Sequence, residues 1–109
     1  MRSRSILLLA VVLSMSACSR SPLAPDGTQI TFSNQTSMAI TEASFSSCDD
    51  LSGFGANLLG AALQPGQQAT FATSKGCHDL QVVFQDGRKK QNWAVTLAAG
   101  AKFTWAVTP

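Results

Sequence analysis

Apolar and polar residues alternate with a period of two over most of the chain after residue 28. Ile30 and Phe32 alternate with polar neighbours, and the pattern recurs in five further short segments. A period of two places successive side chains on opposite faces of a strand, so each segment is predicted to be a half-buried β-strand. The predicted strands cover residues 28–33, 38–45, 68–73, 80–84, 93–97 and 103–107. The fold class predicted is all-β, a small antiparallel β-sandwich of about six to seven strands whose order stays open.

Turn signals separate these segments. Asp86-Gly87 lies between two alternating runs, which is typical of a tight β-hairpin. Pro65-Gly66 is typical of a type II turn, because proline fixes φ at the first central position and glycine accepts a positive φ at the second. The apolar positions shift in phase by one residue between Ile40 and Ala43, which predicts a β-bulge there.

Residues 46–66 form a long irregular stretch between the second and third predicted strands. Leu58, Leu59 and Leu63 make this stretch too apolar for a solvated loop, so it is expected to fold back and pack on the strands. A helical turn is expected near residues 56–59.

The predicted core consists of apolar residues in phase with the strands or in the packed loop. Its members are Ile30, Phe32, Phe45, Leu59, Phe71, Leu80, Val82, Phe84, Val95, Phe103 and Trp105. Trp93 and Trp105 are both in phase with apolar strand positions, so both are expected to be buried. An exposed platform for a sugar or peptide is the alternative.

The N-terminal segment has the composition of an export signal. Residues 1–5 are positively charged, and residues 6–13 are an apolar run too short to span a bilayer. Ser16-Ala17-Cys18 follows, and it resembles the lipobox of bacterial lipoproteins. The resemblance implies cleavage before Cys18 and attachment of diacylglycerol and palmitate to its thiol. An ordinary signal peptide cut after Ala17, leaving Cys18 as a free thiol, is the alternative.

This reading divides the chain into a lipoprotein signal peptide (1–17), a lipidated tether (18–27) and a β-sandwich domain (28–109). Two or three acyl chains would make attachment to the membrane effectively permanent. Ser19 follows the lipidated cysteine, where an aspartate would be the usual signal for retention at the inner membrane. The expected location is therefore the cell envelope, on the periplasmic side of the outer rather than the inner membrane.

Removal of the signal peptide changes the charge of the protein. The chain has 8 basic and 6 acidic residues, but Arg2 and Arg4 belong to the signal, so the remaining side chains are neutral overall. A nucleic-acid partner is therefore not expected. The remaining basic cluster, Arg88-Lys89-Lys90, is interpreted as a solvated hairpin end, or alternatively as a contact with anionic headgroups.

Two cysteines remain after Cys18, an even number in an oxidising compartment. Cys48 and Cys77 are candidates for a disulfide bond. Two buried thiols or a metal pair are the alternatives, although the spacing is not typical of a metal site. His78 is the only histidine and is expected at the surface.

Few residues in the sequence favour metal binding or catalysis, and no cofactor is expected. Asp49, Asp50 and Asp79 are weak candidates for calcium ligands if the cysteines pair, with Asn57 nearby; solvated loop carboxylates are the alternative. One histidine, no tyrosine and no Gly-x-Ser-x-Gly elbow leave few groups for an enzyme. The chain is therefore expected not to be an enzyme.

Four motifs in the sandwich region occur in a fixed order. They are Asn34-x-Thr36, Phe54-Gly55-x-Asn57-Leu58-Leu59-Gly60, Leu63-x-Pro65-Gly66 and Cys77-x-Asp79-Leu80-x-Val82-x-Phe84-x-Asp86-Gly87. Together they resemble a group of small exported bacterial β-domain proteins of unknown function. A second cysteine is common in that group near position 98, where this chain has Ala98, so the resemblance implies Cys48 as the replacement partner of Cys77. It offers no catalytic residue.

The expected function is that of a lipid-anchored envelope protein whose sandwich is a non-enzymatic interaction or structural module with a protein partner. A periplasmic module that binds a small ligand or calcium is the alternative. A flat apolar surface near the 48–66 loop would favour the first function, and a polar pocket there would favour the second.

Overall fold

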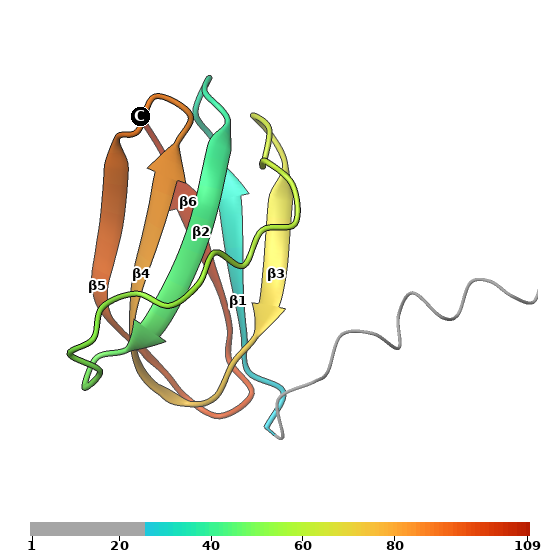
Figure 1. The fold of residues 1–109 in the computed structure, drawn as a ribbon. Coiled ribbons are helices and arrows are strands. Elements are labelled where there is room, and N and C mark those ends of the chain that lie inside the picture. Colours follow the sequence, from blue (N-terminus) through green and yellow to red (C-terminus); the bar gives the residue numbers. More distant parts are fainter. Residues whose placement is uncertain (1–25) are drawn as a thin grey trace, which may run out of the picture.

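The computed structural model describes residues 26–109, which form six strands and no helix (Figure 1). The strands are β1 (Gln29–Asn34), β2 (Ile40–Ser47), β3 (Gln68–Ala72), β4 (Gly76–Phe84), β5 (Lys89–Leu97) and β6 (Lys102–Val107). They form two three-stranded sheets, ordered β3-β1-β6 and β2-β4-β5, that face each other. The predicted small β-sandwich is therefore confirmed, with six strands. Residues 26–109 contain no helix that is long and apolar enough to cross a membrane.

One strand pair differs from the predicted antiparallel arrangement. β1 and β6 are parallel, whereas β1–β3, β2–β4 and β4–β5 are antiparallel. The cause is the loop of residues 48–67, which runs back along the sandwich from the end of β2 to the start of β3 (Figure 1). β2 and β3 therefore run in the same direction, and this extra reversal gives β6 the direction of β1.

The predicted core is confirmed. All eleven predicted residues are either buried or packed against the buried cluster. Phe32 lies at its centre, with its ring centroid 6.0 Å from those of both Phe71 and Trp105. Asn34, which the apolar pattern does not identify, is also fully buried. Its amide donates to the carbonyls of Met38 and Leu63 at 2.9 Å each, so it joins the β1–β2 turn to the long loop.

The long loop covers the outer edge of β2 and has no helical turn. Asn57 accepts a hydrogen bond from Ala43 N at 3.0 Å, and Leu58 N donates to Ala43 O at 2.8 Å. Leu63 is buried and forms a β-bridge with Ile40. The expected turn at residues 56–59 is wrong because these backbone groups pair with the strand edge and keep the segment extended. An edge paired in this way is closed to other strands.

The predicted turns and the bulge in β2 are present. Gly66 has φ +86°, and Gln67 N donates to Gln64 O at 3.0 Å, as in a type II turn. Asp86-Gly87 connects β4 to β5, with Gly87 at φ +90°. The β2–β4 register shifts between Ile40 and Glu42, as the phase of the apolar residues predicts.

His78 is buried, contrary to the prediction that it lies on the surface, and is only 6% exposed. It belongs to the inward face of β4, where its ring packs edge-on against Phe45. Its Nε2 lies 2.7 Å from Ser74 O and therefore carries the proton that it donates to this carbonyl. The histidine thus holds the β3–β4 turn, at the point where the chain crosses from one sheet to the other.

Candidate functional site

Cys48 and Cys77 form a disulfide bond at the end of the sandwich where the described chain begins. Their Cα atoms are 5.4 Å apart, and Cys48 N donates to Cys77 O at 3.0 Å. The bond joins the end of β2 to the start of β4, so it fixes the base of the long loop. The predicted lipidation residue, Cys18, lies outside the described residues.

Trp93 lies on the outer face of the β2-β4-β5 sheet, contrary to the prediction that it is buried. His78 in β4 pairs with Val95 in β5. Two residues further along β4, Leu80 pairs with Asn92, which is three residues earlier in β5. β5 thus contains one extra residue, a β-bulge that reverses the inward and outward phase. Val95 packs against the core, whereas Trp93 is 60% exposed.

The bulge contains the one non-glycine residue with positive φ among residues 26–109. This residue is Ala94, at φ +56°. A left-handed conformation costs an alanine about 1–2 kcal/mol. Asp79 compensates for part of this cost, because its Oδ1 accepts a hydrogen bond from Ala94 N at 2.8 Å. The same carboxylate oxygen lies 3.5 Å from Cys48 Sγ, so Asp79 connects the bulge with the disulfide.

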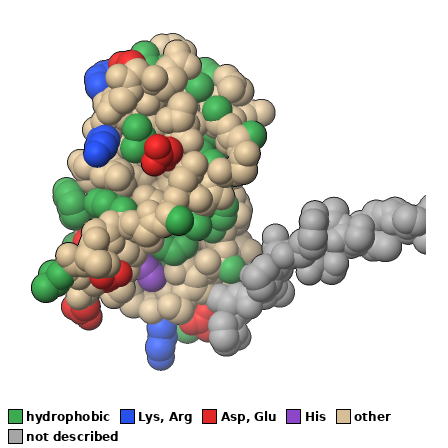
Figure 2. Space-filling model, viewed as in Figure 1, with side chains coloured by type: hydrophobic (Ala, Val, Ile, Leu, Met, Phe, Trp, Pro, Cys, Tyr) green, Lys and Arg blue, Asp and Glu red, His purple; other side chains and the backbone are tan. Residues whose placement is uncertain are grey.

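Phe54 of the long loop packs against Trp93, with ring centroids 5.6 Å apart. Leu51, three residues earlier in the loop, is 96% exposed. Figure 2 shows hydrophobic and acidic side chains on this part of the face, beside β5 and the loop. Leu51, Phe54 and Trp93 are called the apolar end surface. The outer side of β5 and the loop beside it therefore carry exposed apolar side chains.

Of the three candidate calcium ligands, Asp49 is exposed in the loop, whereas Asp50 and Asp79 each accept hydrogen bonds of their own. Asp50 accepts hydrogen bonds from the Ser52 hydroxyl at 2.6 Å and from Ser52 N at 2.9 Å. These bonds, the hydroxyl first, lower the pKa of Asp50. Asp79 is bonded to Ala94 N, and Asn57 lies at the β2 edge. Between residues 26 and 109 no group of three or more His, Cys, Asp or Glu side chains is placed to hold a metal ion.

A pocket of about 320 Å³ lies at the opposite end of the sandwich. It is lined by the β1–β2 turn (residues 36–38), by Phe84 and residues 88–90 of the β4–β5 hairpin, and by residues 108–109. The basic cluster Arg88-Lys89-Lys90 thus contributes to the wall of a pocket. Sequence reasoning identified the cluster but not the pocket, because the turn that closes it is 50 residues earlier in the chain.

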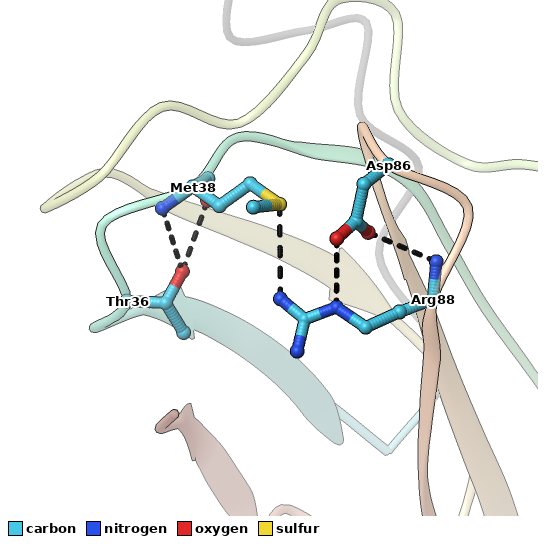
Figure 3. A network of polar contacts seen from close by, with 4 residues as sticks. All are labelled: Thr36, Met38, Asp86 and Arg88. Atoms are coloured by element: carbon cyan, nitrogen blue, oxygen red, sulfur yellow. Dashed lines mark hydrogen bonds and ion pairs between the residues drawn. The ribbon is translucent and has the colours of Figure 1, made fainter.

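The pocket wall is held by a network of polar contacts (Figure 3). Arg88 Nε donates to Asp86 Oδ2 at 2.7 Å, and Arg88 N donates to Asp86 Oδ1 at 3.0 Å. The pKa of Asp86 is lowered, chiefly by the backbone hydrogen bond from Arg88. On the other side, Met38 N donates to the hydroxyl oxygen of Thr36 at 3.2 Å, and this bond shapes the turn.

No family model matches the chain, and neither a curated protein nor a solved structure matches it.

Proposed function

We propose that this protein is a lipid-anchored component of the cell envelope, attached through Cys18, whose sandwich is a non-enzymatic interaction module. Its location is the periplasmic side of the outer membrane. The proposed partner is an envelope protein with an apolar patch bordered by basic residues, and it binds the apolar end surface.

One observation carries the proposal: Trp93 is displayed on the outside of a sheet by a strained bulge. A regular β5 strand would place this position in the interior phase, and the left-handed Ala94 is the cost of turning it outward. Backbone strain of this kind is typical of functional sites. Tryptophan is also the residue type most enriched among interface residues that dominate binding energy.

The chemistry of the partner follows from the neighbours of the surface. Leu51 directly follows Asp49 and Asp50 in the loop, and both carboxylates are exposed. A complementary partner would place an apolar group on Leu51 and Trp93, and basic side chains at the rim. Charge at the rim favours encounter with the right partner more than it adds affinity.

Photo-crosslinking in cells tests the partner. A photoreactive amino acid at position 93 should give one dominant crosslinked product, and the same group at Thr70, exposed on the other sheet, should not. Leu51→Ser in the position-93 protein should reduce the product several-fold. Equal products from positions 93 and 70, or none from position 93, would contradict the proposed partner.

Metabolic labelling with palmitate tests the anchor separately. The wild-type protein should incorporate label and fractionate with membranes, and a Cys18→Ala variant should do neither. A Cys48→Ala variant is the matched control because it also removes one cysteine, and it should retain the label. Unchanged label in Cys18→Ala would overturn the anchor.

A further inference from the structure

The pocket at the end remote from the apolar end surface has the size and the lining of a ligand site. Its volume of about 320 Å³ lies at the small end of the range for ligand pockets, roughly 300–1,000 Å³. Three segments far apart in sequence form it, the β1–β2 turn, the β4–β5 hairpin and residues 108–109. Buried Asn34 fixes the turn, because its Oδ1 accepts hydrogen bonds from both Thr36 N and the Thr36 hydroxyl. The pocket is therefore built on ordered elements.

The charge of the lining favours an anion. Arg88, Lys89 and Lys90 all line the pocket. Asp86 is the carboxylate next to them, and both of its oxygens already accept hydrogen bonds from Arg88. Lys90 Nζ donates to Thr108 O and Pro109 O, which holds this ammonium group beside residues 108–109.

Arg88 is oriented by its contacts and still has donors to offer. Its guanidinium lies 5.6 Å from the centroid of the Phe84 ring, and Nε is bonded to Asp86. Nη2 lies 3.9 Å from Met38 Sδ, which is only a weak acceptor. Within residues 26–109, no oxygen atom accepts a hydrogen bond from Nη1 or Nη2 (Figure 3). An arginine held in this way presents the fork of N–H groups that binds a carboxylate or phosphate.

The remainder of the lining combines three apolar side chains with the hydroxyl side chains of Thr36, Ser37 and Thr108. Phe84 is 7% exposed and forms its inner wall, and Met38 and Pro109 also line it. A ligand that satisfies both parts has one anionic group for Arg88 and a short apolar portion for Phe84 and Met38. We propose that this pocket binds a small organic anion of this kind, such as a medium-chain carboxylate. The site is independent of the partner proposed for the apolar end surface.

Titration of the Cys18→Ala protein with octanoate, followed through its backbone amide NMR signals, tests the proposal. Octanoate should shift the signals of residues 36–38 and 84–90 saturably. Octanol is the matched neutral probe and should bind at least about tenfold more weakly, because its single neutral hydroxyl cannot form the bidentate ion pair that a carboxylate forms with Arg88. Equal affinities for the two probes, or the absence of saturable shifts, would overturn the site.

Variants separate the arginine from general charge and from loss of folding. Arg88→Gln should weaken octanoate binding about tenfold, and Arg88→Lys, which keeps the charge without the fork, should weaken it less. Lys102→Gln removes an equal charge at the other end of the sandwich and should change nothing. A similar loss in Lys102→Gln would contradict the proposal. If Arg88→Gln does not fold, the octanoate affinity of Arg88→Lys is compared with that of wild type. An unchanged affinity in Arg88→Lys would then contradict the role of Arg88.

Vesicles distinguish a soluble anion from a lipid headgroup. The same protein is mixed with vesicles of phosphatidylglycerol in place of octanoate. Shifts of the pocket signals by octanoate but not by vesicles support the proposed small ligand. Shifts by vesicles alone would overturn it in favour of a membrane contact of the basic cluster.

Discussion

Asp79 determines how Trp93 is presented. The two side chains belong to neighbouring strands, and Asp79 accepts the hydrogen bond from Ala94 N, the backbone group that the bulge leaves without a partner in the β4–β5 ladder. Without this acceptor the amide would depend on water, and the left-handed conformation of Ala94 would have less support. One carboxylate therefore stabilises both the bulge and the apolar end surface.

Replacement of Asp79 by alanine should destabilise the protein by about 1 kcal/mol, the net contribution of one hydrogen bond whose amide water can still reach. Urea unfolding measures this loss. Asp49→Ala is the matched control, since it removes an exposed carboxylate from the neighbouring loop, and it should stay within about 0.5 kcal/mol of wild type. Trp93 fluorescence should also change in Asp79→Ala alone. Equal stability of the two variants would show that Asp79 does not support the bulge.

Asp26 links the start of β1 to the β3–β4 turn. Its Oδ1 accepts hydrogen bonds from the Thr28 hydroxyl at 2.7 Å and from Thr28 N at 3.1 Å, and its Oδ2 accepts one from Lys75 N at 3.2 Å. These bonds, the Thr28 hydroxyl first, lower the pKa of Asp26 from its ordinary value of 3.8. The ionised carboxylate thus favours the folded state.

Asp26→Asn should consequently have a pH-dependent effect. A folded-state pKa below the unfolded one gives stability that is fully present above pH 3.8 and is lost as the pH falls through the folded value. The variant should be less stable than wild type near neutral pH and nearly equal to it well below that pKa. Urea unfolding near neutral pH and well below the folded-state pKa measures the difference in stability between the variant and wild type. A deficit of equal size at both values would contradict an ionic role.

At the scale of elements, the sequence predicts where the strands lie better than it predicts which of their side chains are buried. Alternation identifies all six strands and ten of the eleven core residues, because a period of two directly reflects one buried face. It places Trp93 on the wrong face because one extra residue in β5 reverses the phase, and nothing local distinguishes Trp93-Ala94 from a regular pair. It misjudges His78 because burial of this polar side chain depends on Ser74 O, which tertiary structure supplies.

Asn57 holds the long loop against the edge of β2. Asn57 Oδ1 accepts from Ala43 N and Leu59 N at 3.0 Å each, and its amide donates to Thr41 O at 3.3 Å. Asn57→Ala should lower stability by about 1 kcal/mol and expose an unpaired strand edge. Asn57→Asp keeps the acceptor and should lose less. Urea unfolding and light scattering measure the two effects, and a monomeric Asn57→Ala protein of unchanged stability would contradict the role of Asn57.

The candidate site is less predictable than the fold because both of its parts are assembled from distant segments. The apolar end surface combines Leu51 and Phe54 of the loop with Trp93 of β5. The pocket combines the β1–β2 turn with the β4–β5 hairpin. Sequence reasoning identifies the basic cluster and the cysteine pair, which are local or countable features. It cannot identify neighbours that only the strand order brings together.

At the scale of the whole molecule, the sandwich separates its two surfaces. The disulfide lies at the end where the described chain begins, Trp93 lies midway along β5, and the pocket residues lie at the other end (Figure 1). The disulfide fixes the loop that carries Leu51 and Phe54, but no residue of the pocket belongs to that loop. The two ends should therefore respond differently when the disulfide is removed.

The double variant Cys48→Ser, Cys77→Ser tests this separation. The bond closes a loop of about 30 residues, for which the chain-entropy model gives about 3.6 kcal/mol of stability, so urea unfolding should show a loss of this order. Under conditions where the variant is still folded, octanoate affinity should stay within about twofold of wild type, a difference below 0.5 kcal/mol. Crosslinking from position 93 should fall several-fold, because Phe54 would no longer be held against Trp93. Parallel loss of both activities in the folded variant would mean that the two ends are coupled through the core.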